Sequence, residues 1–264
     1  MILRRLTKHV KDQNWFAVGL DFLIVVVGVG VALMGQQWLS DRQARSDYDR
    51  AVLDLRTIIF QVYGTVKERV SIVECRQARY RELGDQLMQT DTPWPGMARE
   101  YDLGGIEAVF PHVTRSPQRL WTSALWDAEL ATGTFDLMDD DTRNTLDRVF
   151  ASSDLIEQKF QFDVSDMEAN LQTLAYPLDL SLSDRLRYFD LLVRADAASA
   201  TMELVARQNI SSFEASGFLK PLNTQEATER REDLAQANAR LNAVYDDCVE
   251  PMVYPDLELE EETE

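Results

Sequence analysis

The sequence predicts an all-α protein: one N-terminal transmembrane helix continues into a long stalk helix, and an antiparallel helical bundle follows. Three observations support this fold class. Residues 16–35 contain a single ionisable residue, Asp21, in an otherwise apolar stretch. Beyond it, apolar residues recur at steps of three and four positions, which is the period of an amphipathic helix. Only eleven glycines and eight prolines occur among 264 residues, so few positions interrupt such helices.

The predicted span covers residues 15–39. At about 1.5 Å per residue, Trp15 and Trp38 lie roughly 34 Å apart, which matches the hydrocarbon core and a little of the headgroup region. Both tryptophans are expected as interfacial anchors, because their amphipathic rings favour that depth. The alternative is a cleaved signal peptide, whose apolar region covers about 7–15 residues and ends in small residues. Here about twenty residues lead into Gln-Gln-Trp, so an uncleaved signal anchor is favoured.

Basic residues flank the span unequally. Residues 1–14 hold four basic residues and one acid: Arg4, Arg5, Lys8, Lys11 and Asp12. The stretch after the span mixes three arginines with three aspartates within residues 40–50. The positive-inside rule therefore favours a cytoplasmic tail (residues 1–14) and an extracytoplasmic bundle (residues 40–252).

One face of the predicted span combines an acid with small residues. On a helical wheel the other members lie within about 40° of Asp21: Val25, Gly28, Ala32 and Gly35. Small residues allow two helices to approach closely, and an acid inside the membrane rarely faces lipid. We therefore expect a helix–helix seam, formed with a second copy or with another envelope protein. The alternative is that Asp21, about 9 Å from Trp15 along the helix, is tolerated near the headgroups.

After the span, the apolar period predicts a stalk helix from Ser40 to Gln89, roughly 75 Å long. Its apolar face is expected to pack on later helices of the chain or, as in a coiled coil, on another subunit.

Residues 90–116 contain several prolines and glycines, which forbid a continuous helix. Long loops often carry function, so Trp94, Tyr101, His112 and Arg115 are candidates for a contact surface. The alternative is that this loop caps the open end of the bundle and its aromatic residues cover apolar surface.

The later helices are marked by their ends. One is expected to begin at Ser116-Pro117 and to stop at Gly133. Acids at 139–141 favour the start of another, which ends before Pro177. The next begins at Ser181 or Ser183 and is expected to turn six residues inward: Leu186, Phe189, Val193, Ala197, Ala200 and Leu204. Asn223 and Glu226 resemble a capping box for the last helix, and residues 253–264 are expected to be a disordered acidic tail.

The two cysteines, Cys75 and Cys248, are candidates for a disulfide if the bundle lies in an oxidising compartment. The bond would close a loop of about 170 residues and, by chain entropy, stabilise the fold by about 4–5 kcal/mol. The alternative is two buried free thiols.

Charge and residue types exclude several classes of function. A net charge of −18 argues against binding nucleic acid or anionic lipid. The histidines, His9 and His112, cannot supply the Glu-x-x-His pairs of a di-iron bundle, and two distant cysteines do not make a zinc site. No Gly-rich phosphate loop or nucleophile elbow occurs. We therefore expect no enzyme, no cofactor and no metal, and the acids at 139–141 are expected to cap a helix.

Two segments resemble an uncharacterised family of bacterial single-pass membrane proteins. The first is the span from Asn14 to Trp38 with its trailing arginines. The second, within residues 121–150, carries the spaced positions of a helix–helix junction in that family: Trp121, Leu125, Gly133, Leu137, Asp140 and Arg143. The resemblance implies an inner-membrane anchor with a periplasmic helical domain, and it implies no activity.

The leading interpretation is a membrane-anchored periplasmic interaction or sensory module that associates with itself or with another envelope protein. One alternative is a proton-coupled, stator-like anchor in which Asp21 is the working group, and this rests on analogy alone. Another is a plain structural envelope protein. A small-molecule ligand cannot be assigned from the sequence.

Overall fold

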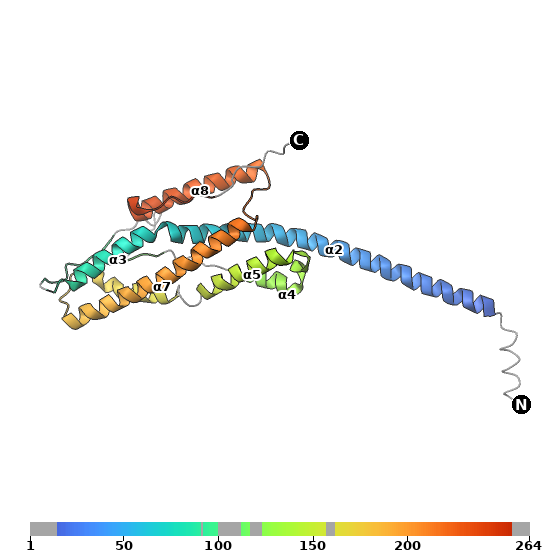
Figure 1. The fold of residues 1–264 in the computed structure, drawn as a ribbon, viewed down its shortest axis with the longest axis horizontal. Helices are drawn as coiled ribbons and strands as arrows, with labels where there is room; N and C mark the ends of the chain where they lie inside the picture. Colours follow the sequence, from blue (N-terminus) through green and yellow to red (C-terminus); the bar gives the residue numbers. More distant parts are fainter. Residues whose placement is uncertain (1–14, 91, 100–111, 117–122, 157–161, 255–264) are drawn as a thin grey trace, which may run out of the picture. The chain divides into compact units, whose positions relative to one another are not determined.

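The computed structural model describes residues 15–90, 92–99, 112–116, 123–156 and 162–254 (Figure 1). The regular structure of these residues is helical, with two isolated β-bridges and no strand. The helices are α2 (Trp15–Ser71), α3 (Val73–Met88), α4 (Ala124–Thr132), η1 (Thr134–Leu137), α5 (Asp140–Leu155), α6 (Phe162–Leu171), η3 (Gln172–Ala175), α7 (Leu182–Ala215), α8 (Thr224–Tyr245) and η4 (Asp246–Cys248). The all-α prediction is confirmed.

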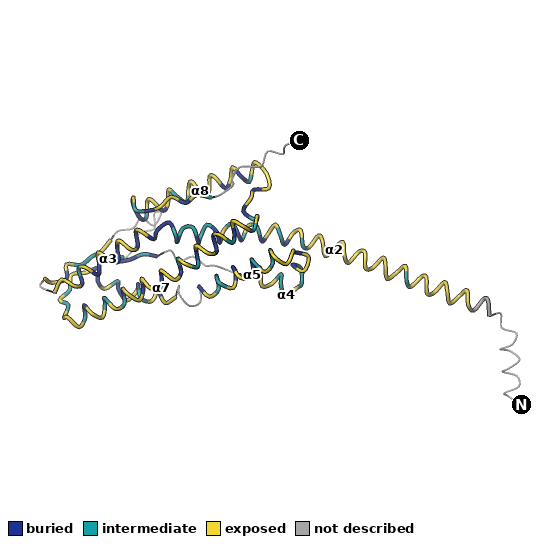
Figure 2. The backbone as a smooth tube through the Cα atoms, viewed as in Figure 1, coloured by how far each residue is buried: buried dark blue, intermediate teal, exposed yellow. Residues whose placement is uncertain are grey.

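The chain divides into two compact units, residues 1–51 and 52–264, and α2 contributes residues to both. In the first unit, nearly all described side chains from residue 19 to residue 50 are exposed (Figure 2). This part of α2 is long and apolar enough to cross a membrane, and none of its most apolar stretch is buried. The coarse prediction of one candidate membrane-spanning helix near the N-terminus is confirmed.

The predicted stalk helix is interrupted once. α2 ends at Ser71 and α3 begins at Val73, with Ile72 between them at φ −98° and ψ 7°. At this break the Ser71 carbonyl accepts a hydrogen bond from the Glu250 backbone N–H, 2.9 Å away. In the second unit the apolar face of α2 and α3 is buried within the chain itself, at Leu55, Ile59 and further positions up to Leu87.

α7 lies against α3, α5 and α6 and so organises the second unit (Figure 1). Its buried residues are Arg185, Leu192, Ala195, Ser199, Met202, Ala206, Asn209, Ile210 and Phe213. The predicted inward face is wrong for five of its six residues: Leu186, Val193, Ala197, Ala200 and Leu204 are exposed, while Phe189 is half-buried. The period identified an apolar face correctly, but this chain buries the opposite face of α7.

The helix ends are capped largely as the sequence predicts. Gly133, at φ 75°, ends α4 in a left-handed conformation, and Asp139 Oδ1 accepts the Thr142 N–H at 2.8 Å to start α5. Ser181 and Asp184 form a full capping box at the start of α7.

At α8, Asn223 Oδ1 accepts from the Glu226 N–H at 2.9 Å. Glu226 bonds the Leu222 N–H instead of the Asn223 N–H, so the reciprocal bond of a capping box is shifted by one residue. The predicted start at Ser116-Pro117 falls on residues 117–122, outside the described part of the chain. The single helix predicted between Asp139 and Pro177 is described as α5 and α6, with residues 157–161 outside the description.

Candidate functional site

The predicted seam of the span lies on the exposed first part of α2. Asp21 is exposed, and a Cβ added at Gly28 or Gly35 would meet no atom within 4 Å. Among the described residues, therefore, nothing covers this face. Trp38 is 60 % exposed and the Arg42 guanidinium lies 5.6 Å from its ring centroid, a cation–π contact one turn along the helix. The side chain of Trp15, the other predicted anchor, lies outside the description.

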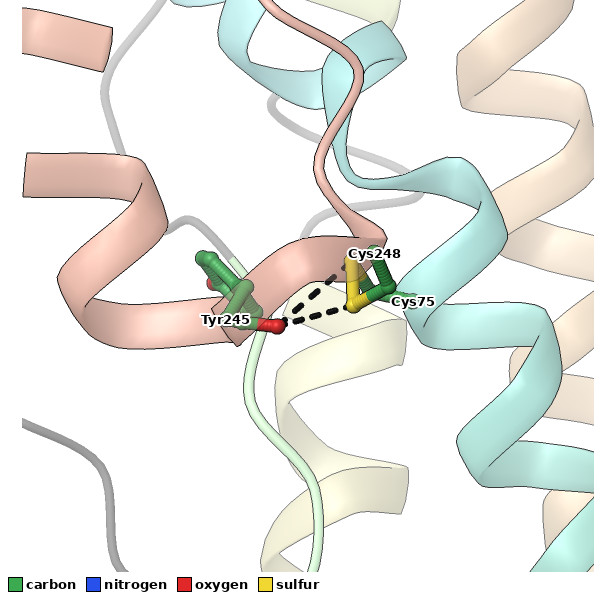
Figure 3. Close-up of a disulfide and its surroundings, with 3 residues drawn as sticks. All are labelled: Cys75, Tyr245 and Cys248. Carbon is green, nitrogen blue, oxygen red and sulfur yellow. Dashed lines mark hydrogen bonds between the residues drawn. A yellow bond between two sulfur atoms is a disulfide. The ribbon is translucent and has the colours of Figure 1, made fainter. Parts of the chain in front are cut away.

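Cys75 and Cys248 form the predicted disulfide, with Cα atoms 5.1 Å apart (Figure 3). Cys75 lies in the first turn of α3 and is buried, whereas Cys248 ends η4 and is half-buried. The Tyr245 carbonyl oxygen lies 2.8 Å from Cys248 Sγ and 3.9 Å from Cys75 Sγ. The bond joins the start of α3 to the end of η4, which directly follows α8, and a small core of apolar residues from both regions surrounds it.

Residues 249–254, which we call the C-terminal strap, continue from this disulfide. Asn238 of α8 holds Met252 by two hydrogen bonds, from the Met252 N–H to Oδ1 at 2.8 Å and from Nδ2 to the Met252 carbonyl at 3.0 Å. The Tyr254 ring packs edge-on against Phe60 and Tyr63 of α2, with centroids 5.3 and 5.2 Å away. Tyr254, assigned from the sequence to a disordered tail, is therefore a packed residue. The strap ties α8 to α2.

A buried cluster of charged and polar side chains joins α2, α3, α6 and α7. Glu168 of α6 is 5 % exposed, and its Oε1 accepts hydrogen bonds from Tyr80 Oη at 3.0 Å and Ser116 Oγ at 2.7 Å. Two buried arginines complete the cluster. Arg69 contacts the Met202 sulfur at 3.7 Å, and Arg76 Nη2 lies 3.6 Å from Glu203 Oε2.

Burial dominates the electrostatics of this cluster. It raises the pKa of Glu168, and the hydrogen bonds from Ser116 and Tyr80 and the two arginines oppose it only in part. Burial also lowers the pKa of Arg69 to about 10, helped by the neighbouring positive charge of Arg76. Burial and the Glu168 carboxylate raise the pKa of Tyr80 above its ordinary value. The cluster is closed to solvent, so it links four helices rather than presenting a reactive group.

The predicted contact loop is divided by the structure. Trp94 is 1 % exposed and its Nε1 donates to the Leu174 carbonyl at 2.8 Å, so it is a core residue and its ring is not on the surface. His112 forms an antiparallel bridge with Arg99, and both His112 and Arg115 are half-buried. The fourth candidate, Tyr101, lies outside the described residues.

Buried arginines hold this loop in place. Arg79 of α3 donates from Nε to the Val113 carbonyl at 2.8 Å and also bonds the Met97 carbonyl. Arg185 of α7 donates to the Thr92 carbonyl at 2.6 Å and to the last carbonyls of α3, where a cation complements the helix dipole. The residues on either side of the undescribed stretch 100–111 are therefore tied to α3 and α7.

A groove of about 500 Å³ lies between α6 and α7. It is lined by Asp163, Asp166, Met167, Arg194, Ala197, Ala198 and Thr201. Among the described residues no group of three His, Cys, Asp or Glu side chains is placed to hold a metal ion.

Sequence reasoning missed the buried cluster and the groove. A hydropathy pattern does not distinguish buried polar residues from solvent-facing ones, and the available signal is the interruption of the apolar period by residues such as Arg69 and Arg76. Comparison of the chain with protein-family models, with curated proteins and with solved structures gives no match. The resemblance noted above therefore stays a prediction.

Proposed function

We propose that the protein is a single-span membrane anchor that holds a disulfide-linked helical bundle on the periplasmic side of the bacterial inner membrane, where it acts as an interaction or sensory module. The observation that carries this proposal is that one helix, α2, contains both the candidate span and the first buried face of the bundle. Because α2 is one continuous helix, a span at its N-terminal part would hold the bundle close to the membrane surface.

Two further observations support the side of the membrane. The Cys75–Cys248 pair is at bonding distance, and structural disulfides persist in oxidising compartments such as the periplasm. The basic residues before the span outnumber acids four to one, which favours a cytoplasmic N-terminus.

The seam of the span supports association within the membrane. No described residue of the chain covers its small residues and Asp21, and a second helix would cover them at close range. We expect the partner to be a second copy or another envelope protein.

Topology is tested with reporters fused after Glu264. An alkaline phosphatase fusion is expected to be active and a fluorescent-protein fusion that folds only in the cytosol is expected to be dark. In intact cells, an alkylating reagent should modify neither Cys75 nor Cys248 before reduction and both of them after it. An inactive phosphatase fusion, together with alkylation of both cysteines without reduction, would place the bundle in the cytosol and refute the proposal.

The seam is tested by cross-linking in membranes. Gly28→Cys and Ala32→Cys lie on the seam, whereas Gly30→Cys lies about 180° from Asp21 and is a matched control, because it is also a glycine with open space around it. We expect adducts at the first two positions only. Equal cross-linking at Gly30, or none anywhere, would refute the seam. Loss of the cellular phenotype on Asp21→Asn with cross-linking intact would favour the proton-coupled alternative.

A further inference from the structure

The exposed face of α7 carries a continuous apolar stripe. Its members, which we call the α7 seam, are Leu182, Leu186, Val193, Ala197, Ala200 and Leu204. The four large side chains are between 50 % and 61 % exposed although they are leucine and valine. On a helical wheel the six residues fall within about 60°, and the buried residues of α7 centre about 200° away. α7 is thus apolar on two opposite faces, and the described part of the chain covers only one of them.

The spacing of the α7 seam resembles that of a paired helix. Successive members are 4, 7, 4, 3 and 4 positions apart, the steps of three, four and seven that keep one stripe facing a partner helix. Two alanines lie at its middle, where small side chains allow close approach. Beside them the groove between α6 and α7, lined in part by Ala197, Ala198 and Thr201, leaves room for a large side chain.

We propose that the α7 seam is where the bundle pairs with a second copy of the same chain, with the two α7 helices parallel. This rests on the proposed function in that a shared membrane concentrates the copies. The charges beside the seam identify the occupant. One flank carries Arg187, Arg194 and Asp190, with a net charge of +1, whereas the other carries Asp196, Glu203 and Arg207, with a net charge of −1. In a parallel pair each basic flank meets the acidic flank of the second copy; in an antiparallel pair like charges would meet.

Arg194 and Asp196 are the pair this geometry brings closest, because they are only two positions apart on opposite flanks. Arg194 already contacts Asp190 at 2.8 Å, and Glu203 contacts Arg207 at 3.0 Å, both one turn apart on the surface of α7. Such i,i+4 pairs are weak and leave both groups available. Arg187, whose guanidinium lies 5.9 Å from the Tyr188 ring centroid, and Asp196 lie outside these ion pairs, so one basic and one acidic group can set the orientation.

The test uses the full chain in membranes with single cysteines and a short bismaleimide, which leaves the native disulfide intact. In a parallel pair identical positions meet along the whole seam, so Leu186→Cys, Ala200→Cys and Leu204→Cys should all give dimers. Thr228→Cys on the exposed face of α8 is the control and should give none. Dimers at only one of the three seam positions would mean that the helices pair antiparallel. No dimer at any of the three positions would mean that the α7 seam is not a pairing surface. Either result refutes the proposal.

A charge swap tests the orientation independently. In the Ala200→Cys background, Arg194→Asp and Asp196→Arg should each lower the dimer fraction several-fold, and the two together should restore it. Arg148→Asp on α5 is the control. Retention of the Cys75–Cys248 disulfide on a non-reducing gel shows that each variant folds. Cross-linking at Gly28→Cys without any at the α7 positions would refute the α7 seam and leave the proposed function standing, whereas cytosolic reporters would refute the function itself.

Discussion

At the scale of single residues, the fold depends on charged groups buried with partners. Arg79, Arg185 and Arg230 are each at most 6 % exposed and each donates to backbone carbonyls that no helix satisfies. A guanidinium has five donors in a rigid fork, so it can hold two chain segments at once. Glu168 differs, because its carboxylate is buried and accepts from neutral hydroxyls.

Glu168 gives a prediction on pH. Since its pKa is raised in the folded state, the stabilising contribution is present below the unfolded value of about 4.3 and is lost as pH rises through the folded value. The free energy of unfolding of the wild type, minus that of Glu168→Gln, should therefore fall as pH rises from 4 towards 7. Urea unfolding across this range measures it. A difference that grows with pH would show that Arg69 and Arg76 keep the carboxylate ionised.

Two glycines give a matched pair. Gly96 has φ 81°, and a Cβ there would lie 2.8 Å from the Pro177 backbone nitrogen; Gly217 has φ 75° with nothing within 4 Å. Gly217→Ala should therefore cost about 1–2 kcal/mol, for the left-handed conformation alone. Gly96→Ala should cost clearly more, because the backbone beside it must also move. Equal losses in denaturant unfolding would mean that the neighbourhood of Pro177 yields freely.

At the scale of elements, the sequence predicted helices well and their inward faces less well. Caps are local, so Gly133, Asp139 and Ser181 could be identified from neighbouring residues alone. Burial is not local. The buried face of α7 includes Ser199, Asn209 and Arg185, which a hydropathy pattern assigns to solvent, while its leucine stripe is exposed. Likewise, the sequence could not show that Trp94 is a core residue, because the Leu174 carbonyl that accepts its hydrogen bond lies eighty positions away in the chain.

The disulfide gives a prediction for α3 and α8. By chain entropy, closing a loop with a sequence separation of 173 stabilises the fold by about 5 kcal/mol, comparable to the net stability of many domains. The paired substitution Cys75→Ala with Cys248→Ala, or reduction, should lower the free energy of unfolding by an amount of this order. Denaturant unfolding with and without a reductant measures it. A loss below about 1 kcal/mol would mean that the unfolded chain is already compact near these residues.

The C-terminal strap gives another prediction on stability. Asn238→Ala removes two hydrogen bonds to Met252 and should cost about 1–3 kcal/mol, because the backbone groups of a buried residue lose their partners. Asn170→Ala is the matched control, since the Asn170 side-chain amide bonds Asp166 on the exposed side of its own helix. If both variants lose the same stability, the strap contributes little. Hydrogen exchange of the Met252 amide reports the same contact directly.

At the scale of the whole molecule, composition and helix length describe two chemically distinct parts. The first part has a long apolar surface whose exposure to water is unfavourable. The second part makes up most of a chain whose net charge is −18. Both were predictable, because hydropathy over about twenty residues and total charge need no knowledge of contacts. The pairing of distant segments, such as Glu168 with Tyr80, required the structure.

The apolar part gives a prediction on membrane attachment. The wild type should remain in the membrane pellet after alkaline carbonate extraction. Val26→Arg combined with Val27→Arg should release a large fraction, because each charge near the centre of a span costs about 2.5–3.5 kcal/mol. Leu53→Arg, at an exposed leucine of the same helix in the second unit, should not. Release of the wild type would mean that the apolar helix does not span the bilayer.

The bond between Cys75 and Cys248 has a consequence for how the protein is degraded. It closes a covalent circle that runs from Cys75 in the first turn of α3 through α8 to Cys248, and α2 precedes this circle in the chain. A protease that nicks any connection inside the circle leaves the two pieces joined to each other and to the candidate anchor. Nicked molecules would keep their full mass on a gel without reductant and would separate into two pieces only once the sulfur–sulfur bond is opened.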